Sequence, residues 1–160
     1  MIPSYAILSA GNFWNLQEIF EQQLGILSTL VGYTGGETLN PTYQQVSEGQ
    51  TGHFEAVKVA YNQSLIDYAH ILDVFFSSHN PTHLTLMSAN NHLLQPSVIF
   101  YLNDKQKELA EKKKLFFQRR FEQPIITEIR PAQIFYPAES HHQHFLLKPG
   151  QTTCCLTGKC

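Results

Sequence analysis

Residues 4–33 read SYAILSAGNFWNLQEIFEQQLGILSTLVGY, and this stretch predicts a strand, a helix and a second strand. Residues 5–9 form a short apolar run that is typical of a buried strand. Apolar side chains then recur through residues 14–24 at the spacing of one helix face, and Gly25 follows where a helix C′ glycine belongs. Residues 26–33 predict the second strand.

The same order returns further along the chain. Residues 55–61 alternate like a strand, and Ser64 and Asp67 resemble a capping box that opens a helix. That helix is expected to bury one stripe of side chains: Leu65, Ala69, Leu72 and Phe76. Residues 97–101 predict the strand that follows. Two strand–helix–strand units in succession are the split βαβ pattern of ferredoxin-like folds, so we expect a single α+β domain.

The remaining segments are less regular. Residues 34–53 and 79–96 show neither helical nor strand periodicity and predict two long loops, which in compact domains are often functional. Residues 104–122 predict a charged helix, whose lysines and arginines we interpret as a solvated face. Residues 125–129 predict a last strand, and residues 130–160 are expected to be extended and irregular.

Composition narrows the functional classes. The chain has 160 residues, 42% hydrophobic and 15% charged, which is typical of one soluble globular domain. The net charge of −2 argues against a nucleic-acid partner. No apolar run approaches the length of a membrane span, and no secretory signal is visible at the N-terminus. We therefore expect a cytoplasmic monomer with no membrane partner.

All three cysteines lie at the C-terminus: Cys154, Cys155 and Cys160. An odd number of cysteines gathered at one end does not form the disulfide framework of a secreted domain. The pattern indicates a thiol-bearing tail instead.

The segment Gly11-Asn12-Phe13-Trp14 lies at the first strand-to-helix turn. A helix N-terminus is positively polarised, so a side chain there can meet ligand oxygens or, if it is a thiol, have a lowered pKa. Taken alone, an aromatic pair at this position is more typical of core packing. Further motifs follow it: Val31-Gly32-Tyr33-Thr34-Gly35-Gly36, Asn40-Pro41-Thr42-Tyr43, Thr51-Gly52-His53-x-Glu55-Ala56-Val57, Val74-Phe75-Phe76 with His79-x-Pro81-Thr82, Thr127-Glu128-Ile129, and Phe135-Tyr136-Pro137-Ala138-Glu139.

In order and spacing, from Gly11 to about Gln143, these motifs resemble the A-type peptide methionine sulfoxide reductases. The resemblance implies a reductase-like domain over residues 1–145 and a cysteine-bearing tail over residues 146–160. It also implies a thiolate that attacks the sulfur of methionine-(S)-sulfoxide, free or in a peptide. The resulting sulfenic acid is resolved as a disulfide, which thioredoxin reduces, and no metal or cofactor is needed.

The resemblance also implies roles for individual residues. Phe13 and Trp14 match the aromatic pair that holds the substrate methyl group. Glu55 and Tyr43 match the glutamate and tyrosine that hydrogen-bond the sulfoxide oxygen and supply a proton. Without the resemblance, Glu55 would be interpreted as a surface charge at the end of a strand; with it, we expect Glu55 in the pocket, where burial would raise its pKa.

The sequence departs from the family at the nucleophile. The family's cysteine falls on Asn12, and an amide nitrogen cannot replace a thiolate. The family's loop aspartate becomes Asn90, which we keep as a candidate binding residue, and its sulfoxide-binding tyrosine and following arginine become Gln95 and Pro96. Near the C-terminus, Asp-Tyr-His-Gln of the family becomes residues 140–143, Ser-His-His-Gln. Several changes around one pocket favour natural divergence over a laboratory substitution at Asn12.

Three functional hypotheses remain. The first is a non-catalytic relative that binds methionine or its sulfoxide, with Asn12 donating an amide hydrogen bond. The second is a reductase whose nucleophile is one of the tail cysteines. The third is a metal- or redox-responsive protein, because His141, His142 and His144 precede the cysteines; their spacing matches no standard zinc pattern, so we expect no metal site.

Overall fold

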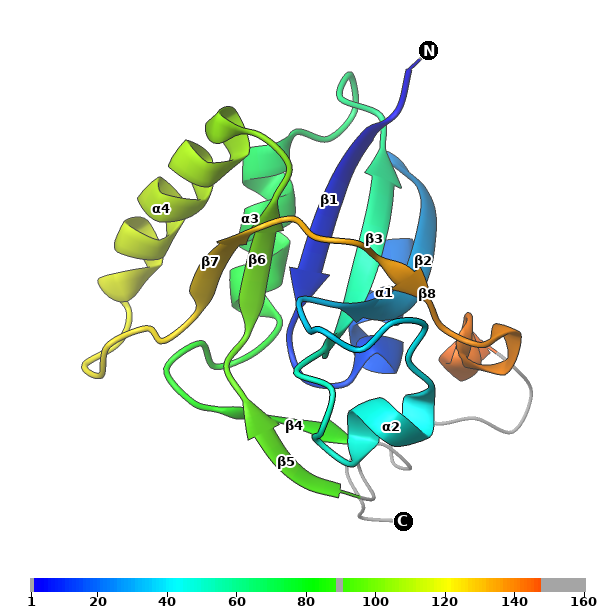
Figure 1. Ribbon diagram of the computed structural model, residues 1–160. Coiled ribbons are helices and arrows are strands. Elements are labelled where there is room, and N and C mark those ends of the chain that lie inside the picture. Colours follow the sequence, from blue (N-terminus) through cyan, green and yellow to red (C-terminus); the bar gives the residue numbers. More distant parts are fainter. Residues whose placement is uncertain (1, 89–90, 148–160) are drawn as a thin grey trace.

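Six strands form one mixed sheet in the computed structural model, which describes residues 2–88 and 91–147 (Figure 1). The sheet order is β7-β6-β1-β3-β2-β8. β1 pairs antiparallel with β3 and β6, and β2 pairs antiparallel with β3, so β1 and β2 run in the same direction. β7 is parallel to β6. The strand bounds are β1 Ser4–Ser9, β2 Ile26–Thr34, β3 Phe54–Tyr61, β6 Val98–Tyr101, β7 Glu128–Pro131 and β8 Tyr136–Pro137.

Three helices cover one face of this sheet: α1 Phe13–Glu21, α3 Tyr68–Ser77 and α4 Asp104–Gln118 (Figure 1). Successive side chains of β1 point to opposite faces of the sheet: Leu8 points into the core under the helices, and Ile7 points into the smaller core on the other face. Phe20 of α1 and Leu72 of α3 are completely buried. Each such side chain stabilises the fold by about 1.5–3 kcal/mol relative to an exposed one. The connection β1-α1-β2 followed by β3-α3-β6 confirms the predicted ferredoxin-like α+β fold.

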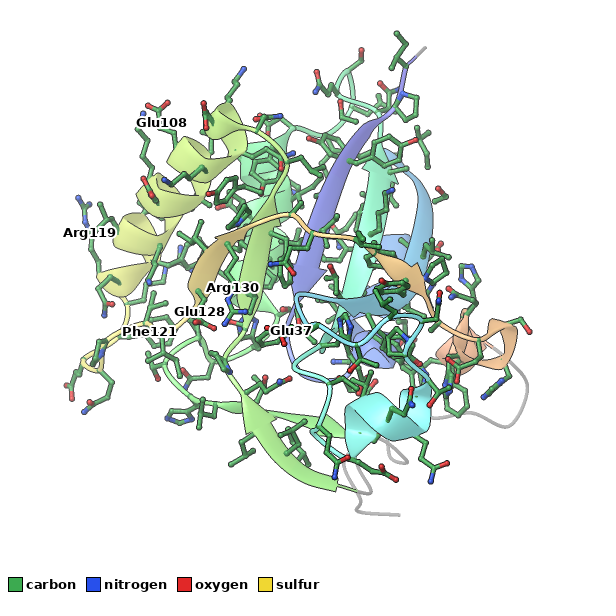
Figure 2. All side chains as sticks on the ribbon, in the orientation of Figure 1. Glu37, Glu108, Arg119, Phe121, Glu128 and Arg130 are labelled. Atoms are coloured by element: carbon green, nitrogen blue, oxygen red, sulfur yellow. The ribbon has the colours of Figure 1, made fainter. Side chains whose placement is uncertain are left out.

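The other face is covered by the chain that crosses the sheet between β7 and β8, in front of the strands in Figure 1. Gly32 makes this crossing possible, because a Cβ there would lie 2.4 Å from the carbonyl oxygen of Tyr136 and 2.6 Å from the ring of Phe135. On β7, Arg130 forms a salt bridge with Glu128 at 3.0 Å and lies over the ring of Phe54 (Figure 2).

Both segments that we expected to be irregular loops contain secondary structure. Within residues 34–53, the structure has α2 Tyr43–Ser47, which begins at a capping box formed by Thr42 and Gln45. Within residues 79–96, β4 Thr85–Ser88 and β5 Asn91–Gln95 form a two-stranded sheet of their own. Both elements are too short for periodicity to reveal them.

Several element boundaries also differ from the prediction. The N-cap of α3 is Asp67, whose side chain accepts from the His70 amide at 2.8 Å, so the helix starts after Ser64. Leu65 therefore precedes the helix and is 61% exposed, whereas Leu72 and Phe76 are buried as expected.

At the end of α4, the Gln118 side chain donates to the Gln123 carbonyl and accepts from the Ile125 amide, which ends the helix before residue 122. β7 consequently begins at Glu128, later than the predicted strand. α1 ends at Glu21, so Gly25, with φ of +96°, lies in the following turn and not at C′.

The segment after β8 is not wholly irregular. It forms two 3-10 turns, η1 Ser140–His142 and η2 Phe145–Leu147. None of the helices in residues 2–88 and 91–147 has the length and apolar character needed to cross a bilayer. Glu108 and Arg119 project from α4 away from the sheet (Figure 2), as expected for a solvated helix face.

Candidate functional site

Asn12 immediately precedes α1 and follows Gly11, which lies in the turn after β1 with φ of +65°. Its Oδ1 accepts a hydrogen bond from the Trp14 amide at 2.7 Å, so Asn12 is the N-cap of the helix. Its Nδ2 is buried and has no hydrogen-bond partner within the described residues. A buried amide without an acceptor is destabilising, and a ligand oxygen would relieve it.

Glu55 lies beside this helix end, on β3, and its side chain is fully buried. Ser9 joins the two strands here by donating to the Glu55 carbonyl at 2.6 Å. Glu55 Oε1 accepts from the Phe13 amide at 3.4 Å, whereas Oε2 is buried with no partner in residues 2–88 and 91–147. The surface-charge interpretation of Glu55 is therefore excluded.

Burial raises the pKa of the Glu55 carboxyl well above its ordinary value of 4.5, and the hydrogen bond from the Phe13 amide opposes this only in part. Burial therefore favours the protonated, neutral form of this carboxyl. A protonated Oε2 is a hydrogen-bond donor. Glu55 and Asn12 thus bring two donors to the N-terminus of α1.

Aromatic rings gather next to these donors. Phe13 is completely buried, and Trp14 and Tyr43 are half-buried above it, with ring centroids 6.1 Å and 6.3 Å from Phe13. Trp14 stacks on Tyr43 at 5.8 Å and on His142 at 5.5 Å. Phe145 stacks on Trp14 at 4.1 Å. The structure thus brings Phe13, Trp14 and Tyr43 together.

His142 and Phe145 also belong to this ring cluster, and no local pattern in the sequence indicates their place in it. They come from η1 and η2, and Gln143 between them ties the segment to β2. Gln143 Oε1 accepts from the Val31 amide at 2.9 Å, and its Nε2 donates to the Val31 carbonyl at 2.8 Å. This segment is more than 100 residues from β2 in the sequence, and only the tertiary fold brings the two together.

Glu139 anchors α2 to the same region. Its Oε1 accepts from the Tyr33 hydroxyl at 2.9 Å and its Oε2 from the Tyr43 amide at 3.2 Å. Partial burial acts to raise the pKa of Glu139, but hydrogen bonds from backbone amides and Tyr33, together with nearby His142, lower it below 4.5 overall. Burial and Glu139 both raise the pKa of the Tyr33 hydroxyl, so Tyr33 remains a donor.

Gln95, which replaces the family's sulfoxide-binding tyrosine, ends β5. Its buried Oε1 has no hydrogen-bond partner in the described part of the chain. The other predicted candidates lie outside the described residues: Asn90, Cys154, Cys155 and Cys160. A cavity of about 510 Å³ lies elsewhere, around Tyr5, Tyr61 and Tyr68, and none of the predicted site residues lines it.

Comparison with known proteins gives the family. The profile described as "Peptide methionine sulfoxide reductase" matches residues 4–160. The chain belongs to this family. A relative from Pasteurella multocida, "Peptide methionine sulfoxide reductase MsrA", is 45% identical over 150 residues, which is 94% of this chain and 86% of the relative.

Solved structures of the family agree with the fold. Mxr1 from Saccharomyces cerevisiae in reduced form superposes with a TM-score of 0.87 at 29% identity, over 97% of this chain and 90% of that one. The methionine sulfoxide reductase A of Corynebacterium diphtheriae gives a TM-score of 0.79 at 26% identity, over 92% and 75%. The resemblance to A-type peptide methionine sulfoxide reductases is therefore confirmed, as is the fold.

Proposed function

We propose that this peptide methionine sulfoxide reductase family member binds methionine sulfoxide, free or in peptides, at the N-terminus of α1, and that residue 12 cannot carry out the family's covalent reduction. The observation that supports the proposal most strongly is the buried Glu55 carboxyl, whose Oε2 has no partner among the described residues and which adjoins the Asn12 cap. A sulfoxide oxygen is a strong acceptor, and here it would meet two buried donors, Glu55 Oε2–H and Asn12 Nδ2–H.

The aromatic rings suit the rest of the ligand. The methyl group of methionine sulfoxide is apolar and would pack against Trp14 and Tyr43, with Phe13 beneath them. Phe145 now covers one face of Trp14. Ligand binding at that face is expected to displace Phe145, and this displacement gives binding an optical signal, because Trp14 is the single tryptophan of the chain.

Reduction requires a thiol that residue 12 does not supply. In the family's reaction, a thiolate sulfur attacks the sulfoxide sulfur, the oxygen passes to the enzyme sulfur as a sulfenic acid, and the thioether leaves. A second thiol then forms a disulfide and releases water. The resemblance places the attacking cysteine at Asn12, whose amide can neither attack nor accept the oxygen. We therefore propose a binding function without turnover by this residue.

The test is a reductase assay on a methionine-(S)-sulfoxide peptide with dithiothreitol, comparing the parent with Asn12→Cys. We expect no turnover by the parent and activity in the variant, whose thiol lies at a helix N-terminus where its pKa is lowered. Asn12→Ser is the matched control, because serine preserves the cap but provides no thiol. Turnover by the parent, or an inactive Asn12→Cys protein that still folds, would contradict the proposal.

A second candidate is reduction by a tail cysteine. The observation that favours it is the position of η2, which ends at Leu147 and holds Phe145 against Trp14. The three cysteines follow η2 in the sequence, seven, eight and thirteen residues after Leu147. A thiol that is not held in place can lose about 7–11 kcal/mol of rate advantage, so slow turnover is expected.

In this candidate, thioredoxin would reduce the disulfide formed between two tail cysteines. Replacing Cys154, Cys155 and Cys160 together by alanine should then abolish any activity of the parent. Activity that survives this replacement would exclude the tail as the source of the nucleophile.

A further inference from the structure

We propose that Glu139, His141 and His142 form a binding site for one divalent first-row transition ion, with Zn²⁺ as the reference ion, at the rim of the aromatic cluster. One ligand atom from each of the three residues lies within 4.8 Å of the other two, which makes them the group in residues 2–88 and 91–147 that could hold a metal ion. Two imidazoles and a carboxylate are also a recognised zinc ligand set.

The geometry is close to what an ion requires. Ligand atoms of a tetrahedral zinc ion lie about 3.4 Å apart, given bonds of about 2.0–2.2 Å. The rings of His141 and His142 have centroids 4.1 Å apart, and His141 is exposed. Rotation of the exposed ring can therefore close the remaining distance. A water molecule would complete the coordination at the fourth position, as in zinc sites with three protein ligands.

The structure selects a different set from the one that the sequence suggested. The three histidines His141, His142 and His144 were the sequence-based candidates. His144, however, points toward α1, where its Nδ1 lies 3.4 Å from Glu21 Oε1. Glu139 replaces His144 in the set. The turn η1 Ser140–His142 begins immediately after Glu139 and brings His141 and His142 beside the Glu139 carboxyl group.

Glu139 is prepared for this role by its surroundings. The Tyr33 hydroxyl and the Tyr43 amide each donate to one of its oxygens, which fixes the orientation of the carboxylate. A carboxylate has about four acceptor sites, so Glu139 can bind an ion while it accepts from the Tyr33 hydroxyl, the Tyr43 amide and its own amide. Partners of this kind orient the ligands in known metal sites and raise their affinity. The anionic carboxylate of Glu139 also favours a cation electrostatically.

An ion at this position would act on the aromatic cluster. The His142 ring lies 4.3 Å from the Tyr43 ring and 5.5 Å from the Trp14 ring. Coordination would immobilise His142 and hold Glu139 against α2, so the rim of the cluster would become more rigid. Ion binding does not depend on residue 12, and it can be measured without any reductase assay.

The test is titration of the tag-free full chain with Zn²⁺ by calorimetry, in a background where the three tail cysteines are replaced by serine. The chain should bind one ion. Cu²⁺ should quench the emission of Trp14, which is the only tryptophan and stacks on His142. Binding should weaken as the pH falls from 7 to about 5.5, because protons compete for the imidazoles.

Two variants locate the ion. His141→Ala should weaken Zn²⁺ binding at least about tenfold, the lower end of the loss seen even for residues that only orient ligands. His144→Ala is the matched control and should change the affinity less than about twofold. Circular dichroism would check that each variant folds. Absence of Zn²⁺ binding at millimolar concentration, unchanged affinity in His141→Ala, or an equal loss in His144→Ala would overturn the proposal. Binding that requires the tail cysteines would also overturn it.

Discussion

Replacing Glu55 by glutamine should change how the stability of the protein depends on pH. Burial raises the pKa of this carboxyl in the native state well above 4.5, its ordinary value and the one expected in the unfolded chain. Between these two pKa values the native state binds one proton more than the unfolded state. This carboxyl alone therefore lowers the free energy of unfolding of the parent by about 1.4 kcal/mol for each pH unit above 4.5, until it ionises.

Glu55→Gln keeps the shape and neutrality of the protonated carboxyl and has no proton to lose. The stability of the variant minus that of the parent should thus be constant below about pH 4 and should grow by about 1.4 kcal/mol per pH unit above 4.5. The assay is urea denaturation followed by circular dichroism, in half-unit steps from pH 4 to pH 8. Burial also lowers the pKa of His79 to about 4, so both proteins lose stability below about pH 6.5. This effect cancels in the difference.

The exposed Glu37 provides the matched control (Figure 2). The stability of Glu37→Gln minus that of the parent should show no comparable slope across the same pH range, because this side chain lies in water in both states. If instead the Glu55→Gln difference is flat between pH 5 and pH 7, Glu55 is ionised in the native state. It could then not donate to a sulfoxide oxygen, and the reasoning about its burial would be refuted.

Three further predictions concern the surroundings of the site. Asn12→Ala removes the 2.7 Å cap on the Trp14 amide and should cost about 1 kcal/mol in urea denaturation, whereas an Asn12→Ser protein of equally low stability would argue against the cap. Gln143→Leu leaves the buried Val31 amide without its 2.9 Å acceptor and should cost about 1–3 kcal/mol, with faster hydrogen exchange at Val31; unchanged exchange would contradict this role. Phe145→Ala should red-shift the emission of Trp14 and tighten methionine sulfoxide binding, because the covered ring face becomes accessible; an unshifted spectrum would show that Phe145 does not cover it in solution.

Local pattern predicted the elements that carry a clear apolar signature. β1 and β3 are short runs of mostly apolar residues that are buried on both faces, and α1 carries an apolar stripe, so each was found within a few residues of its observed bounds. Short elements that depend on a helix cap or on strand pairing were missed. α2 begins at the Thr42–Gln45 capping box, and β4 and β5 pair with each other. Such short elements carry too few residues for a period to emerge.

The sequence by itself determined the family and the chemical identity of residue 12. The order of the motifs is linear information, and an asparagine remains without a thiol however the chain folds. The tertiary structure alone decided that Glu55 is a buried carboxyl and that Glu139, not His144, joins His141 and His142. The physical reason is that burial and convergence depend on packing between distant segments. The sequence is the same whether water or a helix lies against a carboxyl group on a strand, but water favours its ionised form and burial favours its protonated form.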